Sequence, residues 1–197
     1  MSKVVIQGNA SGTGNFTIAA PNSNTDRTLT LPDADGTLDR LDRAGNVLQV
    51  VSTEKSDQFT TTSTTFVDVT GMSATITPTS SSSKILVMFS VGLVGNSTGG
   101  QSVYLQLVRD STAISIGDAA GSRSRVSAGN GGDQSYDTSS LTITNLDSPS
   151  TTSAVTYKIQ MRSQTSGTAK FNSRGDDTDN SAQARTSASI TLMEIAG

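Results

Sequence analysis

The chain has 197 residues, which suits one domain of ordinary size or one domain with a smaller appendage. Only 33% of the residues are hydrophobic and 4% aromatic, whereas 31 Ser and 29 Thr supply small hydroxyl groups, a composition typical of a β-rich protein with long polar turns. The net charge of −3 disfavours nucleic acid, and the absence of His and Cys removes the usual general base, disulfides and thiolate metal sites. We therefore expect no enzymatic activity and no cofactor.

Signals for export and membrane insertion are not found in the sequence. No stretch approaches the ~18 consecutive apolar residues of a membrane-spanning helix. The first residues, MSKVVIQGNAS, lack the apolar core of a secretory signal. We expect synthesis in a cytoplasm, no membrane insertion, and a role outside the cell only as part of a particle.

Residues 1–37 form an opening segment of short strands and turns. Three short runs, at 4–6, 16–19 and 27–31, have strand character, and the turns between them carry Pro, Asn, Asp and Gly. These strands are too few and too polar to bury a core alone, so they need a partner surface, unless the segment is a poorly ordered arm. The residues expected to make that attachment are Phe16, Ile18, Leu29 and Leu31.

Residues 38–46 are predicted to be a short helical or turn linker. Leu38 and Leu41 lie three residues apart among alternating Asp and Arg, and Gly45 could end a helix. Two helical turns are not stable alone. The segment is therefore interpreted as a hinge or as part of a three-stranded helical neck.

Residues 47–197 read as strands separated by turns. In the clearest strand, 154–162, hydrophobic residues alternate with polar ones, which predicts one buried and one hydrated face. The expected strands are 47–51, 57–61, 64–69, 73–77, 84–92, 102–109, 112–116, 139–145, 154–162, 168–172 and 186–195.

Two of these strands have hydrophobic residues on both faces. The run KILVMFSVG is apolar on both sides at its centre, and in the last strand Met193 and Ile195 lie out of phase with Ile190 and Leu192. Such strands need cover on both sides, and a lone sandwich leaves its outer face wet. We expect another copy of the chain to supply the cover, with an interface that includes Met88, Val94, Met193 and Ile195.

Three long polar loops, 94–101, 117–138 and 172–185, are expected to carry binding. Loops longer than about 12 to 15 residues are usually functional or disordered. Tyr136, in the same loop as Arg123 and Arg125, could stack on a sugar or contact a protein partner. The expected receptor-binding residues are Arg123, Arg125, Tyr136, Arg174 and Asp176.

Other chemical patterns in the sequence are weaker. Asp176, Asp177 and Asp179 could hold Ca²⁺, but the loop lacks the glycine and the distal Glu of an EF-hand, and a solvated loop explains them as well. The tripeptide Arg174–Asp176 spells an integrin motif, which we interpret as a turn. Ser81 and Lys84 have the spacing of serine acyl enzymes without their other two elements. Only two Glu residues, Glu54 and Glu194, occur, so no acid pair suggests glycan cleavage.

The segment FTIAAPNSNTDRTLTLPDADGTL resembles an N-terminal adaptor module of tail-fibre and related virion proteins of tailed bacteriophages, including phages of cyanobacteria and other marine bacteria. From Val47 onward the chain resembles the phage version of the complement- and tumour-necrosis-factor-type jelly roll. The resemblance is carried by FTTTSTTFVDVTGMSATITP, SSSSKILVMFSVG, VYLQLVRD, TYKIQMRS and ASITLMEI. It implies an all-β, two-sheet antiparallel jelly-roll sandwich that forms homotrimers, with the C-terminal strand near the threefold axis.

The function expected from residues and resemblance together is structural. Residues 1–37 would attach the chain to other virion proteins of the tail, baseplate or capsid, 38–46 would link, and 47–197 would present loops to a host-surface glycan. The main expectation is a trimeric tail fibre or fibre tip in a bacteriophage virion, made in the bacterial cytoplasm. The alternative is a trimeric capsid decoration protein that stabilises the head. A depolymerase and a free carbohydrate-binding module are further alternatives.

Overall fold

The computed structural model describes residues 11–14, 17, 22, 24–26, 28, 43–131, 133–135 and 137–197. The chain divides into two units, residues 1–38 and 39–197. The predicted N-terminal strands, including Phe16, Ile18, Leu29 and Leu31, lie outside the described residues. Of the predicted linker, residues 43–46 form a turn closed by a hydrogen bond from the Asn46 amide to the Arg43 carbonyl (3.0 Å).

All strands of the described residues belong to the second unit. They are β1 (Val47–Lys55), β2 (Phe59–Thr61), β3 (Val67–Ile76), β4 (Lys84–Asn96), β5 (Val103–Arg109), β6 (Thr112–Ile114), β7 (Ala128–Gly129), β8 (Ser139–Asp147), β9 (Val155–Ser163), β10 (Ala169–Phe171) and β11 (Ala188–Ile195). No helix occurs between residues 43 and 197 as far as they are described, so the prediction of an all-β chain is confirmed there.

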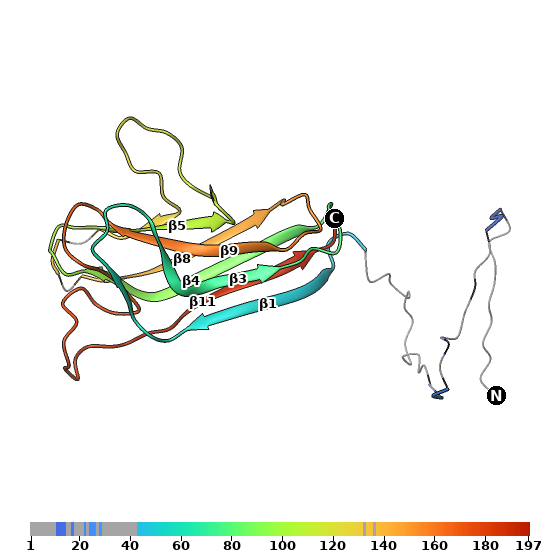
Figure 1. Cartoon of the computed structure of the whole chain (residues 1–197), viewed down its shortest axis with the longest axis horizontal. Helices are drawn as coiled ribbons and strands as arrows, with labels where there is room; N and C mark the ends of the chain where they lie inside the picture. The colour runs from blue at the N-terminus through green and yellow to red at the C-terminus, as the bar shows by residue number, and fades with distance from the viewer. Residues whose placement is uncertain are drawn as a thin grey trace. The chain divides into compact units, whose positions relative to one another are not determined.

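The strands form two antiparallel sheets that pack as a sandwich (Figure 1). In the first sheet, β1 pairs with β11, β11 with β4, and β4 with β8, while the short strands β10 and β2 extend the far end. In the second sheet, β3 pairs with β9, β9 with β5, and β5 with β6 and β7.

The pairing is nested along the chain, and this defines a jelly roll. The first long strand pairs with the last (β1 with β11), β3 with β9, β4 with β8, and β5 with β6. A single long hairpin that rolls up gives this order and closes two sheets over one core. The predicted two-sheet sandwich is therefore confirmed.

The core lies between the sheets and follows from alternation along the strands. In β9, Val155, Tyr157, Ile159 and Met161 are buried, and in β11 Ile190 and Leu192 are buried. Because side chains of a strand alternate between faces, the residues between them point away from the core. For β11 these outward residues include Met193 and Ile195, as the sequence predicted.

Strand β3 joins two segments that the sequence predicted as separate strands. Gly71 has φ of 81°, a left-handed conformation, and the pairing with β9 shifts between Asp68 and Ser73. The irregularity is a bulge inside one strand. Glycine accepts the backbone conformation of such a bulge at low cost.

The two ends of the sandwich differ. At one end, the Gly45 amide donates to the Ala196 carbonyl and the Ala196 amide to the Asn46 carbonyl, both at 2.8 Å, so the chain enters beside its own C-terminus. The loops 97–102 and 172–187 follow β4 and precede β11 at the opposite end (Figure 1). We call these the entry end and the loop end.

Candidate functional site

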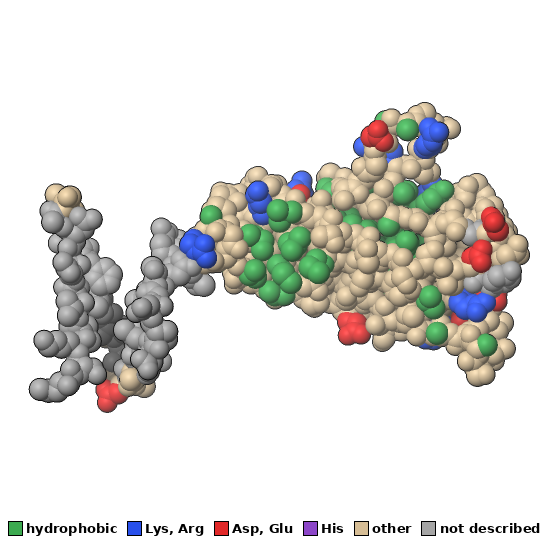
Figure 2. Space-filling view, turned by 180° about the vertical axis from the view of Figure 1, so that it is seen from behind, with side chains coloured by type: hydrophobic (Ala, Val, Ile, Leu, Met, Phe, Trp, Pro, Cys, Tyr) green, Lys and Arg blue, Asp and Glu red, His purple; other side chains and the backbone are tan. Residues whose placement is uncertain are grey.

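The outer face of the first sheet carries an unusual row of hydrophobic residues. Where β1, β11, β4 and β8 lie side by side near the entry end, one transverse row is Val50, Met193, Leu86 and Leu146. Val50 and Leu146 are more than half exposed, at 56% and 53%. Figure 2 shows hydrophobic side chains gathered on one face of the sandwich toward this end.

The rows next to it, toward the loop end, consist mainly of hydroxyl side chains. The second row is Ser52, Thr191, Met88 and Thr144, and the third is Glu54, Ser189, Ser90 and Thr142. The hydroxyls of Ser52 and Thr191 form a hydrogen bond with each other at 2.9 Å. Glu54, at the edge, is the single charge of these three rows, and the exposed Lys84, which pairs with Ile195, follows Leu86 on the same face toward the entry end. We call this face the outer face of the first sheet.

The corresponding face of the second sheet is charged. Lys158 of β9 forms an ion pair with Asp68 of β3 at 2.8 Å, and Gln160 donates to the same carboxylate at 2.8 Å. Hydrogen bonds from Lys158 and Gln160 lower the pKa of Asp68 below its usual value. The second sheet has the surface of a hydrated sheet, whereas the first has the low charge and exposed hydrophobic area that are typical of protein contacts.

The structure places three of the four predicted interface residues on the outer face of the first sheet. Met88 is 43% exposed, and Met193 and Ile195 are half-buried. Whether another chain covers them stays a prediction. Val50, Leu86 and Leu146 complete the row but were missed, because their strand partners cannot be read from one sequence.

Val94 requires a correction. Its side chain is fully buried in the core of the sandwich, so it is not available to a partner chain. The pairing of β4 with β8 shifts between Val91 and Val94. A bulge there adds one residue to the alternation, so that Val94 turns inward although Met88 and Ser90 point outward.

Glu194 lies behind the hydrophobic row, inside the sandwich. It is fully buried. Its carboxylate accepts hydrogen bonds from the side-chain amide of Gln49 (2.6 Å) and from the backbone N–H and the hydroxyl of Thr79 (both 2.7 Å). Burial raises the pKa of Glu194, but the hydrogen bonds from Gln49 and Thr79 outweigh it and lower the pKa to about 2. The carboxylate therefore fixes the turn after β3 against β1 and β11.

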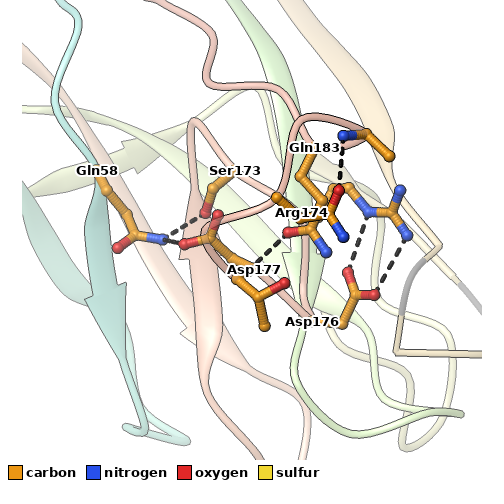
Figure 3. A network of polar contacts seen from close by, with 9 residues as sticks. Gln58, Ser173, Arg174, Asp176, Asp177 and Gln183 are labelled. Atoms are coloured by element: carbon orange, nitrogen blue, oxygen red, sulfur yellow. Dashed lines mark hydrogen bonds and ion pairs between the residues drawn. The ribbon is translucent and has the colours of Figure 1, made fainter.

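The loop end carries an ordered polar network (Figure 3). Gln58 donates to the Ser173 hydroxyl (2.5 Å) and to Asp177 (3.1 Å), and Asp177 also pairs with Arg185 (2.8 Å). Gln183 accepts from the Thr178 amide at 2.7 Å. The loop 172–187 is thus tied to itself and to the segment before β2.

The predicted receptor-binding residues fall into two groups. Arg174 and Asp176 form an ion pair with each other at 3.0 Å at the loop end, so the integrin-like tripeptide is a closed turn. Arg123 and Arg125 are exposed on the loop between β6 and β7. Tyr136 lies outside the described residues.

The predicted metal ligands do not form a metal site. Asp176 is paired with Arg174, Asp177 with Arg185, and Asp179 is exposed on the loop. Among the residues that the structure describes, no three acidic, His or Cys side chains are grouped to hold an ion. The arginines occupy the carboxylates that the sequence suggested as ligands.

In the same described part of the chain, no helix is long and apolar enough to cross a membrane.

Comparisons with known proteins give few matches. No family model and no curated protein matches the chain. Two solved structures of infectious bursal disease virus are similar in part: that of the Gt strain at 16% identity and a TM-score of 0.43, and that of the Gx strain at 15% and 0.38. The similarity covers 86% and 87% of this chain but 38% and 42% of those chains. At such TM-scores these matches carry no inference about the function of this chain.

Proposed function

We propose that the chain is a structural protein of a bacteriophage virion, a homotrimeric tail fibre or fibre tip without catalytic activity. The outer faces of the first sheets pack against one another, the N-terminal segment attaches to other virion proteins, and the loops face the host. The resemblance of FTIAAPNSNTDRTLTLPDADGTL and of the jelly-roll segments to phage virion proteins suggests this setting. The observation that carries the proposal is the row of hydrophobic residues on the outer face of the first sheet, beside two rows of mostly hydroxyl side chains.

This face supports self-association for an energetic reason. Hydrophobic side chains such as Val50 and Leu146 lose contact with water when a second copy covers them, at roughly 25 cal/mol per Å² of apolar area. Within the hydroxyl rows, Ser52 and Thr191 hydrogen-bond each other, which lowers the desolvation cost of burying that pair. The three rows can be buried without an unpaired ion, because Glu54 lies at their edge and Lys84 lies beyond the hydrophobic row toward the entry end.

The two ends of the sandwich support the proposed orientation. The first strand of the sandwich begins at the entry end, beside Ala196. In subunits packed side by side, these strands would all begin at the same end of the trimer. The tied loop 172–187 lies at the loop end, opposite the end where residues 45 and 46 pair with Ala196. Three identical weak sites on one trimer gain by avidity.

The location of the chain in intact particles tests the proposal. Antibodies raised against residues 47–197 should label the tail fibres in electron micrographs of phage particles. Label on the head would contradict the tail fibre and favour a capsid decoration protein. Particles without label would overturn the proposal that the chain is a virion protein. Incubation with host envelope polysaccharide should leave its chain length unchanged, because no catalysis is proposed.

A further inference from the structure

A polar groove lies on the second sheet, under the loop between β6 and β7. Its volume is about 550 Å³, within the roughly 300–1,000 Å³ of small-molecule sites. The residues that line it come from β5, β9 and the two adjoining loops. They are Tyr104, Ser122, Arg123, Ser124, Arg162, Gln164 and Thr165.

The groove is positively charged in a chain that is otherwise slightly acidic. Elsewhere in the sandwich, Arg109, Arg174 and Arg185 each form an ion pair with an aspartate. In contrast, Arg123 and Arg162 contact no carboxylate among the described residues. Arg123 donates only to the Ala120 carbonyl (3.3 Å), and no carboxylate lines the groove. An anionic ligand would supply the missing charge.

Arg162 is held rigidly at the base of the groove. Its guanidinium lies 4.7 Å from the ring centre of Tyr104 and 5.4 Å from that of Phe66. It also donates to the carbonyls of Thr64 (3.3 Å), Ser163 (3.0 Å) and Gln164 (3.0 Å). A further hydrogen bond, to the Ser124 hydroxyl (2.6 Å), ties the overhanging loop to β9. The Nε–H of Arg162 has no acceptor among the described residues. A guanidinium fixed in this way loses little conformational entropy when it binds an anion.

Polar groups without a charge complete the groove. Ser122 and Thr165 contribute hydroxyl groups to the groove. The side-chain oxygen of Gln164 accepts a hydrogen bond from the Ser102 backbone amide (3.1 Å), so the NH₂ group of Gln164 can donate to a ligand. Such groups suit sugar hydroxyls. Single-stranded nucleic acid is less well matched, because bases need free aromatic faces and a face of Tyr104 is covered by Arg162.

We propose that this groove binds an acidic carbohydrate, with a sugar carboxylate against Arg123 and Arg162. Guanidinium groups match carboxylates in geometry and charge. The inference deepens the proposed function, since host attachment gives such a glycan a role, and it rests on that function only for its biological setting. The binding itself is measurable on the purified chain.

Calorimetric titration of the full chain at physiological ionic strength tests this inference. The probes are a short oligogalacturonate, a malto-oligosaccharide of equal length as the neutral control, and a short single-stranded DNA as the polyanion control. We expect binding of the oligogalacturonate alone. No binding of it, or equally tight binding of the DNA, would overturn the proposal.

Two arginine variants on the same loop separate the groove from general charge. Arg123→Ala removes a groove residue, whereas Arg125→Ala removes the same charge from an exposed residue that does not line the groove and donates to the Gly117 carbonyl (2.7 Å). We expect Arg123→Ala to weaken binding about tenfold and Arg125→Ala less than about threefold. Equal losses would overturn the groove as the site. Both positions are exposed, so unchanged melting temperatures should verify folding. Particle labelling tests the virion role separately, so the two proposals can fail independently.

Discussion

At the scale of single residues, Glu194 shows how a carboxylate can be stable inside a lean core. Its charge is stabilised by hydrogen bonds from Gln49 and Thr79, and it forms no ion pair with a cation of the described residues. We expect Glu194→Gln to lower the free energy of unfolding by about 2 kcal/mol, because the new NH₂ group would face donors that now bind the carboxylate. Urea unfolding at neutral pH measures the loss, and a change below a few tenths of a kcal/mol would contradict the assignment.

The same residue predicts a dependence of stability on acid. The pKa of Glu194 falls from 4.5 to about 2 on folding, so the folded state binds its proton less readily than the unfolded state does. Its contribution is complete above about pH 4.5 and is lost as the pH falls through about 2. The difference in unfolding free energy between the unchanged chain and Glu194→Gln should therefore shrink across this range. A difference that stays constant across this pH range would show that folding does not lower the pKa of Glu194.

A second buried group connects three strands. The Tyr157 hydroxyl donates to Asp147 at 2.6 Å, and Arg109 donates to the same carboxylate at 2.9 and 3.0 Å. Burial and the hydrogen bond to Asp147 raise the pKa of Tyr157, so the hydroxyl keeps its proton in alkaline solution. We expect Tyr157→Phe to cost about 1.5 kcal/mol and to be coupled to Asp147→Asn in a double-mutant cycle. Additive losses would contradict this contact.

At the scale of elements, the loop 172–187 depends on one glycine. Gly175 is buried, and a Cβ there would collide with the carbonyl oxygens of Asn96 and Ser135. We expect Gly175→Ala to displace the loop and to lower stability by about 1–3 kcal/mol, because the obstacles are backbone atoms. Limited proteolysis should then cut the loop faster. Gly117→Ala is the matched control, since a Cβ at Gly117 meets nothing within 4 Å. Equal resistance of both variants would contradict the packing.

The strands could be predicted well because alternation marks them locally. The pattern of hydrophobic residues in β9 and β11 fixes both the strand and the face of each side chain. The errors occur where the backbone leaves that period. The bulge before Val94 reverses the face of the following residue, and the bulge at Gly71 divides one strand into two apparent ones. Each bulge contains a glycine, Gly71 or Gly92, which signals an irregular strand but does not give the face of the residues that follow.

The candidate site was less predictable, because loop conformation and strand pairing decide which side chains meet. Pairs such as Arg185 with Asp177 turned a suspected metal cluster into a set of ion pairs. Arg162 ends the alternating strand predicted at 154–162, and its contacts with Tyr104 and Phe66 place it at the base of a groove. The ion pair depends on the conformation of the loop 172–187, and the groove depends on the pairing of β9 with β5, and periodicity gives neither.

At the scale of the whole molecule, the contrast between the two outer faces makes self-association testable. Met193 stands in the hydrophobic row of the first sheet, where Met193→Glu would place a charge between subunits but leave it hydrated in a separated sandwich. Burial of an unpaired charge costs about 3 kcal/mol or more, which weakens each contact by at least about a hundredfold. We expect the variant to sediment as a monomer with unchanged circular dichroism, whereas the unchanged chain sediments as a trimer.

A charge on the other face provides the control for this experiment. Ser73→Glu adds the same carboxylate to an exposed position of the second sheet, opposite Lys158, and should leave the trimer intact. If both variants dissociate the protein, net charge and not the hydrophobic row governs association. If the unchanged chain sediments as a monomer, the low charge of the outer face of the first sheet has another cause, and the fibre proposal loses its structural basis.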